Sequence, residues 1–119
     1  GQTILHLDFH PWNILMTGSR PVIIDWENIC CGHPLADVGR STLLIRQAIL
    51  PPGIDIARAF LFALFRRLFV IYYLQRYFEL RPGSREEMET WMPVLAAARL
   101  REGIQLEEET LLKIAEGRK

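Results

Sequence analysis

The chain has 119 residues, of which 50% are hydrophobic and 24% charged, a composition that excludes a disordered protein and fits one folded unit or part of one. Its 14 basic residues balance its 14 acidic ones, so the net charge supports neither a nucleic-acid nor a membrane-surface partner. The most apolar stretch, 59–74, is interrupted by Arg66 and Arg67, which excludes a membrane span there. Cys30 and Cys31 are neighbours, which favours small buried reduced thiols and a cytoplasmic protein.

The first third of the chain consists of short apolar runs separated by turn residues, which predicts small strands and loops. The runs at 13–16 and 22–24 are separated by Thr-Gly-Ser-Arg-Pro, a composition typical of a hairpin connection. We therefore expect a β-hairpin from Asn13 to Asp25, with its two ends close together.

From Pro34 onward the pattern is helical. The sequence predicts one helix over 35–50, which ends at the Pro-Pro-Gly that follows. A second helix, capped by Asp55, is expected to run towards Leu80. Because that helix is apolar on nearly all sides, we expect it to be the buried centre of a bundle.

The last third predicts shorter helices. Ser84 begins an S-x-x-E capping box, which predicts the start of a third helix. Pro93 breaks or kinks this helix, or begins a new one that continues to about Arg101. A short amphipathic helix is expected over 107–116. The predicted fold class is α+β, mainly α with a small β-hairpin.

Polar side chains concentrate just before the expected hairpin, where His6, Asp8, His10 and Asn13 lie within eight residues. Asp25 lies just after it. If the hairpin forms, Asp8, Asn13 and Asp25 converge, and the two carboxylates repel each other unless a cation joins them. A small set of oxygen ligands of this kind suits Mg²⁺, which also binds substrate phosphates.

Three motifs in order carry a resemblance to a known family. The H-x-D-x-x-x-x-N run of His6, Asp8 and Asn13 is followed by Ile-Ile-Asp-Trp around Asp25, and then by Gly-His-Pro-Leu-Ala-Asp-Val at 32–38. This arrangement resembles the catalytic segment of the aminoglycoside phosphotransferase and choline kinase-like family. The order and spacing make the signal specific over about the first 45 residues. The resemblance implies a protein-kinase-like fold.

The resemblance also implies roles for the acidic residues. Asp8 is expected to be the catalytic carboxylate, which orients the acceptor hydroxyl and accepts its proton. Asn13 and Asp25 are expected to hold the Mg²⁺ ions that bridge the phosphates of ATP. This division fits phosphoryl transfer, where positioning and charge neutralisation supply most of the catalysis.

Four further positions receive supporting roles from the same resemblance. His6 is expected to brace the catalytic loop by hydrogen bonding, and Asp37 to tie the following helix to the loop backbone. Leu15 and Ile24 are expected to line the apolar floor under the adenine. The family often has glycine where Leu7 stands, so the loop backbone is expected to differ slightly here.

The lysine, glutamate and phosphate-covering loop of the family belong to an N-terminal lobe that we expect to be absent from this chain. No P-loop or G-x-G-x-x-G pattern replaces them, and the polar chemistry begins almost at Gly1. We therefore expect a fragment, a kinase-like C-terminal lobe forming a single unit over 1–119. Residues 1–39 are expected to hold the catalytic loop, hairpin and metal-binding segment, and residues 40–119 a helical bundle.

The expected function is ATP- and Mg²⁺-dependent transfer of the γ-phosphate to a hydroxyl of an aminoglycoside-, choline- or sugar-like small molecule. The fragment is expected to be inactive without its N-terminal lobe. One alternative is a non-catalytic helical interaction module derived from such a kinase, and exposed apolar surface then predicts self-association. A weaker alternative is a transition-metal hydrolase that uses His6, His10 and Asp8.

Two tryptophans flank the expected site. Trp12 and Trp26 favour core packing, with stacking on a substrate as the alternative.

Overall fold

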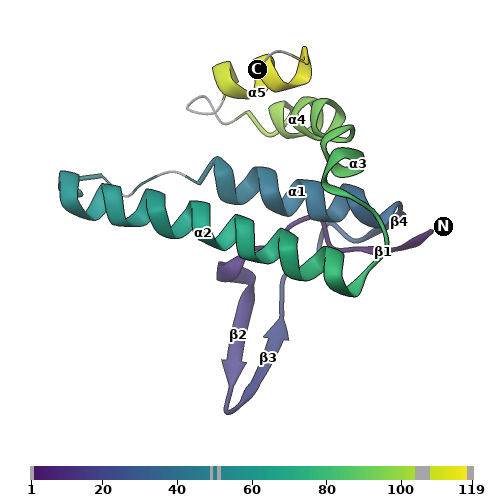
Figure 1. Cartoon of the computed structure of the whole chain (residues 1–119), viewed down its shortest axis with the longest axis horizontal. Coiled ribbons are helices and arrows are strands. Elements are labelled where there is room, and N and C mark those ends of the chain that lie inside the picture. Colours follow the sequence, from purple (N-terminus) through teal and green to yellow (C-terminus); the bar gives the residue numbers. More distant parts are fainter. Residues whose placement is uncertain (1, 49, 51, 104–107, 118–119) are drawn as a thin grey trace.

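The computed structural model describes residues 2–48, 50, 52–103 and 108–117. It is mainly helical, with two small antiparallel sheets, and its fold class is α+β (Figure 1). The elements in chain order are β1 (Thr3–Leu5), a 3-10 turn η1 (Pro11–Asn13), β2 (Ile14–Thr17), β3 (Arg20–Ile23), β4 (Cys30–Gly32), α1 (Pro34–Arg46), α2 (Ile56–Leu80), α3 (Arg85–Glu89), α4 (Met92–Leu100) and α5 (Glu108–Ala115).

The predicted hairpin is present as β2 and β3, with Ile14 opposite Ile23 and Thr17 opposite Arg20. Its turn contains Gly18 at a φ of 65°, a left-handed conformation that glycine adopts without steric cost. The hairpin projects away from the helices (Figure 1), and Leu15 and Val22 are exposed on it. At the end of the hairpin nearest the helices, residues 13 and 24 lie side by side. Most residues of β2 and β3 are exposed in the described part of the chain.

A second sheet, which the sequence did not predict, joins β1 to β4. Leu5 lies opposite Cys30 and Thr3 opposite Gly32. A Cβ on Gly32 would lie 2.9 Å from Cδ1 of Leu5, so a larger residue there would require the Leu5 side chain to shift. Cys30 and Cys31 are exposed free thiols, which corrects the expectation that they are buried. Because β4 pairs with β1, the first turn of α1 lies next to the segment that follows β1.

Helix α1 is the centre of the fold. His33 caps it through Nδ1, which accepts the Leu35 backbone N–H at 3.2 Å, and Pro34 occupies its first turn. One side of α1 packs on α3 and α4, where a Cβ on Gly39 would lie only 2.7 Å from Leu95. Another side packs on α2 through Val38 and Ile45. The helix ends at Arg46, four residues before the predicted end.

Helix α2 is not the buried centre that the sequence predicted. It begins where expected, with Asp55 Oδ1 accepting the Arg58 N–H at 2.8 Å, but Val70 and Leu74 are its buried residues. Phe60 is 67% exposed and Tyr72 is 72% exposed. The prediction was wrong because α2 lies along one side of α1 (Figure 1) and its first half extends past the other helices. The apolar composition of a helix does not by itself show which of its faces other elements cover.

The remaining helices follow their sequence signals. Ser84 Oγ accepts the Glu87 N–H at 3.2 Å and caps α3, which ends at Glu89. Pro93 stands in the first turn of α4 and begins a new helix, one of the three predicted outcomes. Helix α5 packs on α4 through Leu111, and position 107 of its predicted range lies outside the described residues. Among the described helices, none is both long and apolar enough to cross a membrane.

Candidate functional site

The site is built on the loop between β1 and η1, which carries His6 and Asp8. Leu7, between them, has a φ of 62°, in the left-handed region that costs a residue with a Cβ about 1–2 kcal/mol. Glycine avoids this cost, which gives a physical reason for the glycine common at this position in the family that the motifs resemble. Here leucine adopts the same conformation because its two peptide groups are held from outside the loop.

Helix α1 holds these peptide groups with two charged side chains. The N–H groups of His6 and Leu7 donate to Oδ2 and Oδ1 of Asp37, at 2.9 and 2.8 Å. The carbonyl of Leu7 accepts from Nε of Arg40 at 3.1 Å. Hydrogen bonds to charged groups contribute about 1.5–3 kcal/mol each, enough to offset the backbone strain. The orientation of the Asp8 backbone is therefore set by α1.

Arg40 is a residue that the sequence analysis missed. It is buried, and its Nη2 also pairs with Glu102, beyond the end of α4. Glu102 pairs in turn with Arg99. The available signal was its position one helical turn after Asp37, on the same face of the predicted helix. Arg40 thereby joins the loop to both α1 and the α4 end.

His6 is 4% exposed, and both ring nitrogens are engaged. Its Nδ1 accepts the Asp8 N–H at 3.1 Å, so the proton lies on Nε2, which donates to the Ile24 carbonyl at 2.8 Å. The ring also makes an edge contact with Trp26, with 4.5 Å between centroids. Because both ring nitrogens of His6 are engaged in hydrogen bonds, the structure does not support the transition-metal alternative.

Asp8 and Asn13 are in direct contact. Asn13 Nδ2 donates to the Asp8 carboxylate Oδ2 at 3.0 Å and to the Asp8 carbonyl at 2.8 Å. Asn13 is buried, and its backbone N–H donates to the His10 carbonyl within η1. Because the amide nitrogen is committed to Asp8, Oδ1 is the atom of Asn13 that can ligate a cation.

Asp25 is connected to this loop through its neighbour. The N–H of Ile24 donates to the Asn13 carbonyl at 2.9 Å, and the Ile24 carbonyl accepts from His6. Asp25 follows at a φ of 62°, exposed, with Trp26 Nε1 donating back to the Ile23 carbonyl at 2.9 Å. The contacts of its neighbours Ile24 and Trp26 thus hold the chain on either side of Asp25.

Oxygen-bearing side chains of the type that Mg²⁺ binds lie on the loop and after the hairpin. Across the described ranges, no three His, Cys, Asp or Glu side chains gather as a metal site. The oxygens available are those of Asp8, Asn13 and Asp25, of which the first two are in contact. Mg²⁺ needs few protein ligands, because water and substrate phosphates complete its shell. Asn13 Oδ1 and the Asp25 carboxylate are ligands of the type that it prefers.

The hairpin supplies an apolar face beside these residues. Leu15 lies directly opposite Val22, and Ile24 stands two residues further along the chain. Because side chains alternate along a strand, Leu15 and Ile24 share one face of the hairpin. Leu15 is exposed and Ile24 half-buried, which leaves this face accessible to a flat ligand.

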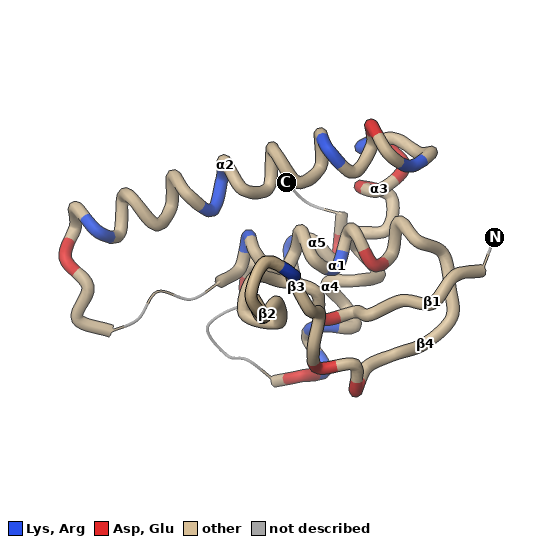
Figure 2. Tube along the Cα trace, turned by 90° about the horizontal axis from the view of Figure 1, so that it is seen from below, with Lys and Arg blue, Asp and Glu red and all other residues tan. Residues whose placement is uncertain are grey.

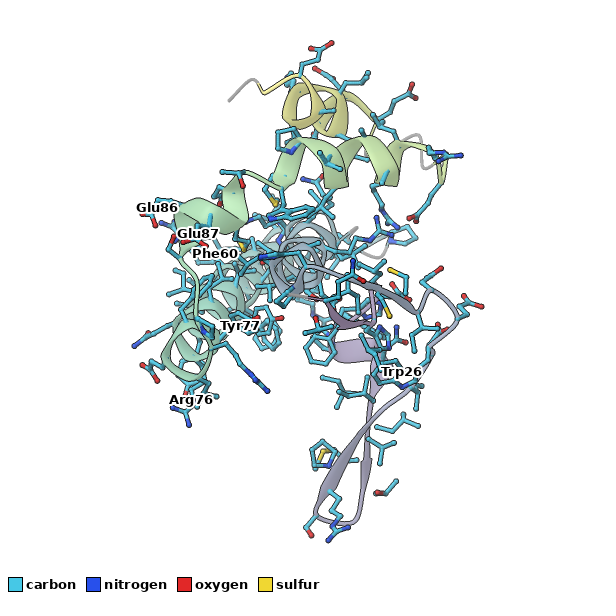
Figure 3. All side chains as sticks on the ribbon, turned by 90° about the vertical axis from the view of Figure 1, so that its right-hand side faces the viewer. Trp26, Phe60, Arg76, Tyr77, Glu86 and Glu87 are labelled. Atoms are coloured by element: carbon cyan, nitrogen blue, oxygen red, sulfur yellow. The ribbon has the colours of Figure 1, made fainter. Side chains whose placement is uncertain are left out.

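A cavity of about 350 Å³ opens next to Asp8. Trp12 lines this cavity and is 70% exposed. Trp26 is also exposed and lies at the base of the hairpin (Figure 3). The prediction that these two tryptophans pack in a core was therefore wrong. The cavity lies between the loop, the end of α1 and the first half of α2, and is lined by Asp8, His10, Pro11, Trp12, Leu44, Ile45, Ala48, Phe62, Phe65, Arg66, Phe69 and Arg99.

The second half of α2 packs against the loop that carries Asp8. The ring of Phe9 lies 6.2 Å from the ring of Tyr73, centroid to centroid. Burial raises the pKa of Tyr73 to about 12. Burial also raises the pKa of Tyr77, which points from α2 towards the strands (Figure 3). Phe9 of the loop thus lies against a tyrosine ring that stays neutral until strongly alkaline pH.

The family of the chain is shown by a match to a family model. Residues 2–91 match the model of the phosphotransferase enzyme family, which is most of the chain. The chain therefore belongs to that family, and the match extends through α3, well beyond the motifs that suggested it. No curated protein and no solved structure matches the chain.

Proposed function

We propose that this chain carries the catalytic loop of an ATP- and Mg²⁺-dependent phosphotransferase that acts on a hydroxyl of a small molecule. One observation supports this above all: the Asp8 carboxylate is held by Asn13 and faces a cavity of about 350 Å³. In the reaction, the acceptor oxygen forms a bond to the γ-phosphorus while the bond to the β-phosphate oxygen breaks. The acceptor proton passes to Asp8, and ADP leaves.

The other site residues take supporting roles in this proposal. Asn13 and Asp25 hold Mg²⁺, which neutralises charge on the phosphates when bound. Leu15 and Ile24 form the floor under the adenine. His6 braces the loop against the Ile24 carbonyl, at 2.8 Å, and Asp37 holds the backbone before Asp8.

The cavity favours an acceptor with an apolar body and no positive charge. Aromatic and aliphatic side chains form most of the lining, and its charged members besides Asp8 are Arg66 and Arg99. Arg99 is paired with Glu102, whereas Arg66 donates to the neutral Ala48 carbonyl, so the Arg66 charge repels the ammonium groups of an aminoglycoside or of choline. An aromatic or sugar-like alcohol that is neutral or anionic is therefore the proposed acceptor.

We further propose that the chain is inactive without a nucleotide-cradling N-terminal lobe as its partner. The sequence has no Gly-rich phosphate loop, and the hairpin face with Leu15 lies open within the described residues. Exposed neighbouring thiols at Cys30 and Cys31 fit the reducing conditions of the cytoplasm.

The test measures ADP release by the protein expressed from its complete gene, beside the 119-residue chain. Asp8→Asn is expected to lower kcat by about a hundred- to ten-thousand-fold while Mg-ATP affinity is retained. Asp25→Asn is expected to weaken Mg-ATP binding. Asp55→Asn, an exposed helix cap, is the control and leaves both unchanged. Full turnover in Asp8→Asn, or unaltered Mg-ATP affinity in Asp25→Asn, contradicts the proposal.

The exposed face of α2 favours a second candidate function, a helical interaction module. Phe60, Leu61 and Phe65 are each exposed by more than half on one stretch of this helix. Exposed apolar patches of this kind mark interaction sites, and a second copy of the chain is the proposed partner. Sedimentation is expected to show concentration-dependent dimers that Phe60→Gln weakens. A strictly monomeric chain contradicts this candidate.

A further inference from the structure

A second cavity, of about 500 Å³, is lined by four arginines and a few apolar residues of α2. Arg46 is the last residue of α1, Arg66 and Arg67 lie in the middle of α2, and Arg85 is the first residue of α3. We call this cavity the arginine pocket. Asp8 and the rest of the catalytic loop are absent from its lining.

The positive charge in the arginine pocket is mostly uncompensated. Glu89 lies 3.5 Å from Nη1 of Arg46 and 4.0 Å from Nε of Arg85, so two guanidinium groups share one carboxylate. Arg67 has no acidic partner among the residues that the structure describes. Four guanidinium groups and one carboxylate leave three positive charges, in a chain whose net charge is zero.

Arg66 is positioned by the backbone rather than by an acid. Its Nη1 donates to the Ala48 carbonyl at 2.9 Å, and its guanidinium lies 5.9 Å from the Phe62 ring centroid. It also lines the cavity beside Asp8, so the two cavities meet at this side chain. A carbonyl leaves the charge of Arg66 in place, with further N–H groups able to donate.

We propose that the arginine pocket binds a small phosphate-bearing anion. Like charges around one cavity repel unless an anion joins them, and the guanidinium fork matches phosphate oxygens in pairs. The volume lies in the range of small-molecule sites. The bound anion joins α1, α2 and α3 through one residue or more from each. Since Arg66 also lines the cavity beside Asp8, occupancy fixes part of that wall. This site stands on geometry and charge, independently of the proposed catalytic function.

The experiment titrates pyrophosphate into the 119-residue chain at constant ionic strength and follows arginine side-chain resonances by NMR. Arg67→Gln is the main variant, because residue 67 is exposed and glutamine preserves helix propensity. Arg76→Gln is the matched control on the same helix: its side chain is 60% exposed, pairs with Glu79 and points away from the fold (Figure 3). Figure 2 shows that basic residues recur along α2. A general attraction of anions to this helix would therefore depend on Arg76 as much as on Arg67, whereas binding in the arginine pocket depends on Arg67 alone of the two.

Saturable binding that perturbs Arg46, Arg66, Arg67 and Arg85 is expected. Losing one charged hydrogen-bond partner is expected to weaken binding about tenfold in Arg67→Gln, and Arg76→Gln leaves it unchanged. Arg85→Gln repeats the test from α3. Equal weakening by the pocket and control variants, or a response that only follows ionic strength, overturns the proposal. Binding of a short oligonucleotide without binding of pyrophosphate also overturns it.

Discussion

The Asp37 carboxylate accepts the backbone N–H of Leu7 at 2.8 Å, across 30 positions of sequence, and Leu7 has a φ of 62°. A strained residue of the loop is thus stabilised by a charged residue of the following helix. The strain lies next to Asp8, the proposed catalytic residue. The shape of the loop therefore depends on β4 and α1 being docked, not on the loop sequence alone.

The first prediction concerns Asp37. Asp37→Ala removes the acceptors of two backbone N–H groups, and we expect it to lower the free energy of unfolding by about 3 kcal/mol. Urea unfolding followed by circular dichroism measures this. Asp55→Ala is the control, because an exposed helix cap contributes about 1 kcal/mol. Equal losses in the two variants would show that Asp37 makes no more than an ordinary helix-start contact.

The second prediction isolates the backbone strain at Leu7. Leu7→Gly and Leu7→Ala both remove the side chain beyond Cβ, and only glycine adopts the left-handed conformation without cost. We expect the glycine variant to be more stable than the alanine variant by about 1 kcal/mol in thermal or urea unfolding. In α2 the order reverses, because Ala63→Gly lowers stability by about 0.5–1 kcal/mol. If alanine is more stable than glycine at position 7 as well as at position 63, strain at Leu7 is excluded.

Local signals predicted the elements whose ends are marked by single residues. Asp55 and Ser84 begin helices where the sequence placed them, and Pro93 begins a helix, one of the outcomes predicted for it, because capping and proline chemistry act within one turn. The β1–β4 pairing was missed, because β4 is the short Cys-Cys-Gly run and its partner lies 25 or more positions away. Pairing of this kind depends on tertiary contacts rather than on strand propensity.

The same distinction separates the parts of the candidate site. The contact of Asp8 with Asn13 spans five positions and follows from the motif spacing. Arg40 was missed, because its target is the Leu7 carbonyl, 33 positions earlier. Its spacing from Asp37 places it on the same helix face but does not identify that target. The exposure of α2 was missed for a related reason: composition gives the apolar surface, and only packing decides which part of it is covered.

The third prediction tests that exposure. Phe60→Gln is expected to change the free energy of unfolding by about 0.5 kcal/mol or less, because Phe60 is 67% exposed. Leu74→Ala, at a buried position of the same helix, is expected to cost about 2–5 kcal/mol. Chemical denaturation at low protein concentration keeps self-association out of the measurement. A loss of several kcal/mol in the free energy of unfolding of Phe60→Gln would instead indicate that this part of α2 is buried, as the sequence alone predicted.

The fourth prediction is an alkaline decline in stability caused by Tyr73. Its pKa is raised by burial from 10.0 to about 12, so between these values the unfolded chain has released a proton that the folded chain keeps. Stability is therefore full below pH 10.0 and falls as the pH rises towards about 12. Thermal unfolding across this range measures the slope, and ultraviolet absorbance follows tyrosine ionisation.

Tyr73→Phe is expected to reduce the alkaline slope, because phenylalanine has no proton to release. Part of the slope is expected to persist, since burial also raises the pKa of Tyr77. Tyr72→Phe is the matched control on the next residue, which is 72% exposed, and it is expected to retain the wild-type slope. If Tyr73→Phe and Tyr72→Phe give the same slope as wild type, the Tyr73 phenol is hydrated in the folded protein. The packing of α2 against the loop that carries Asp8 would then be looser than the contact between Phe9 and Tyr73 requires.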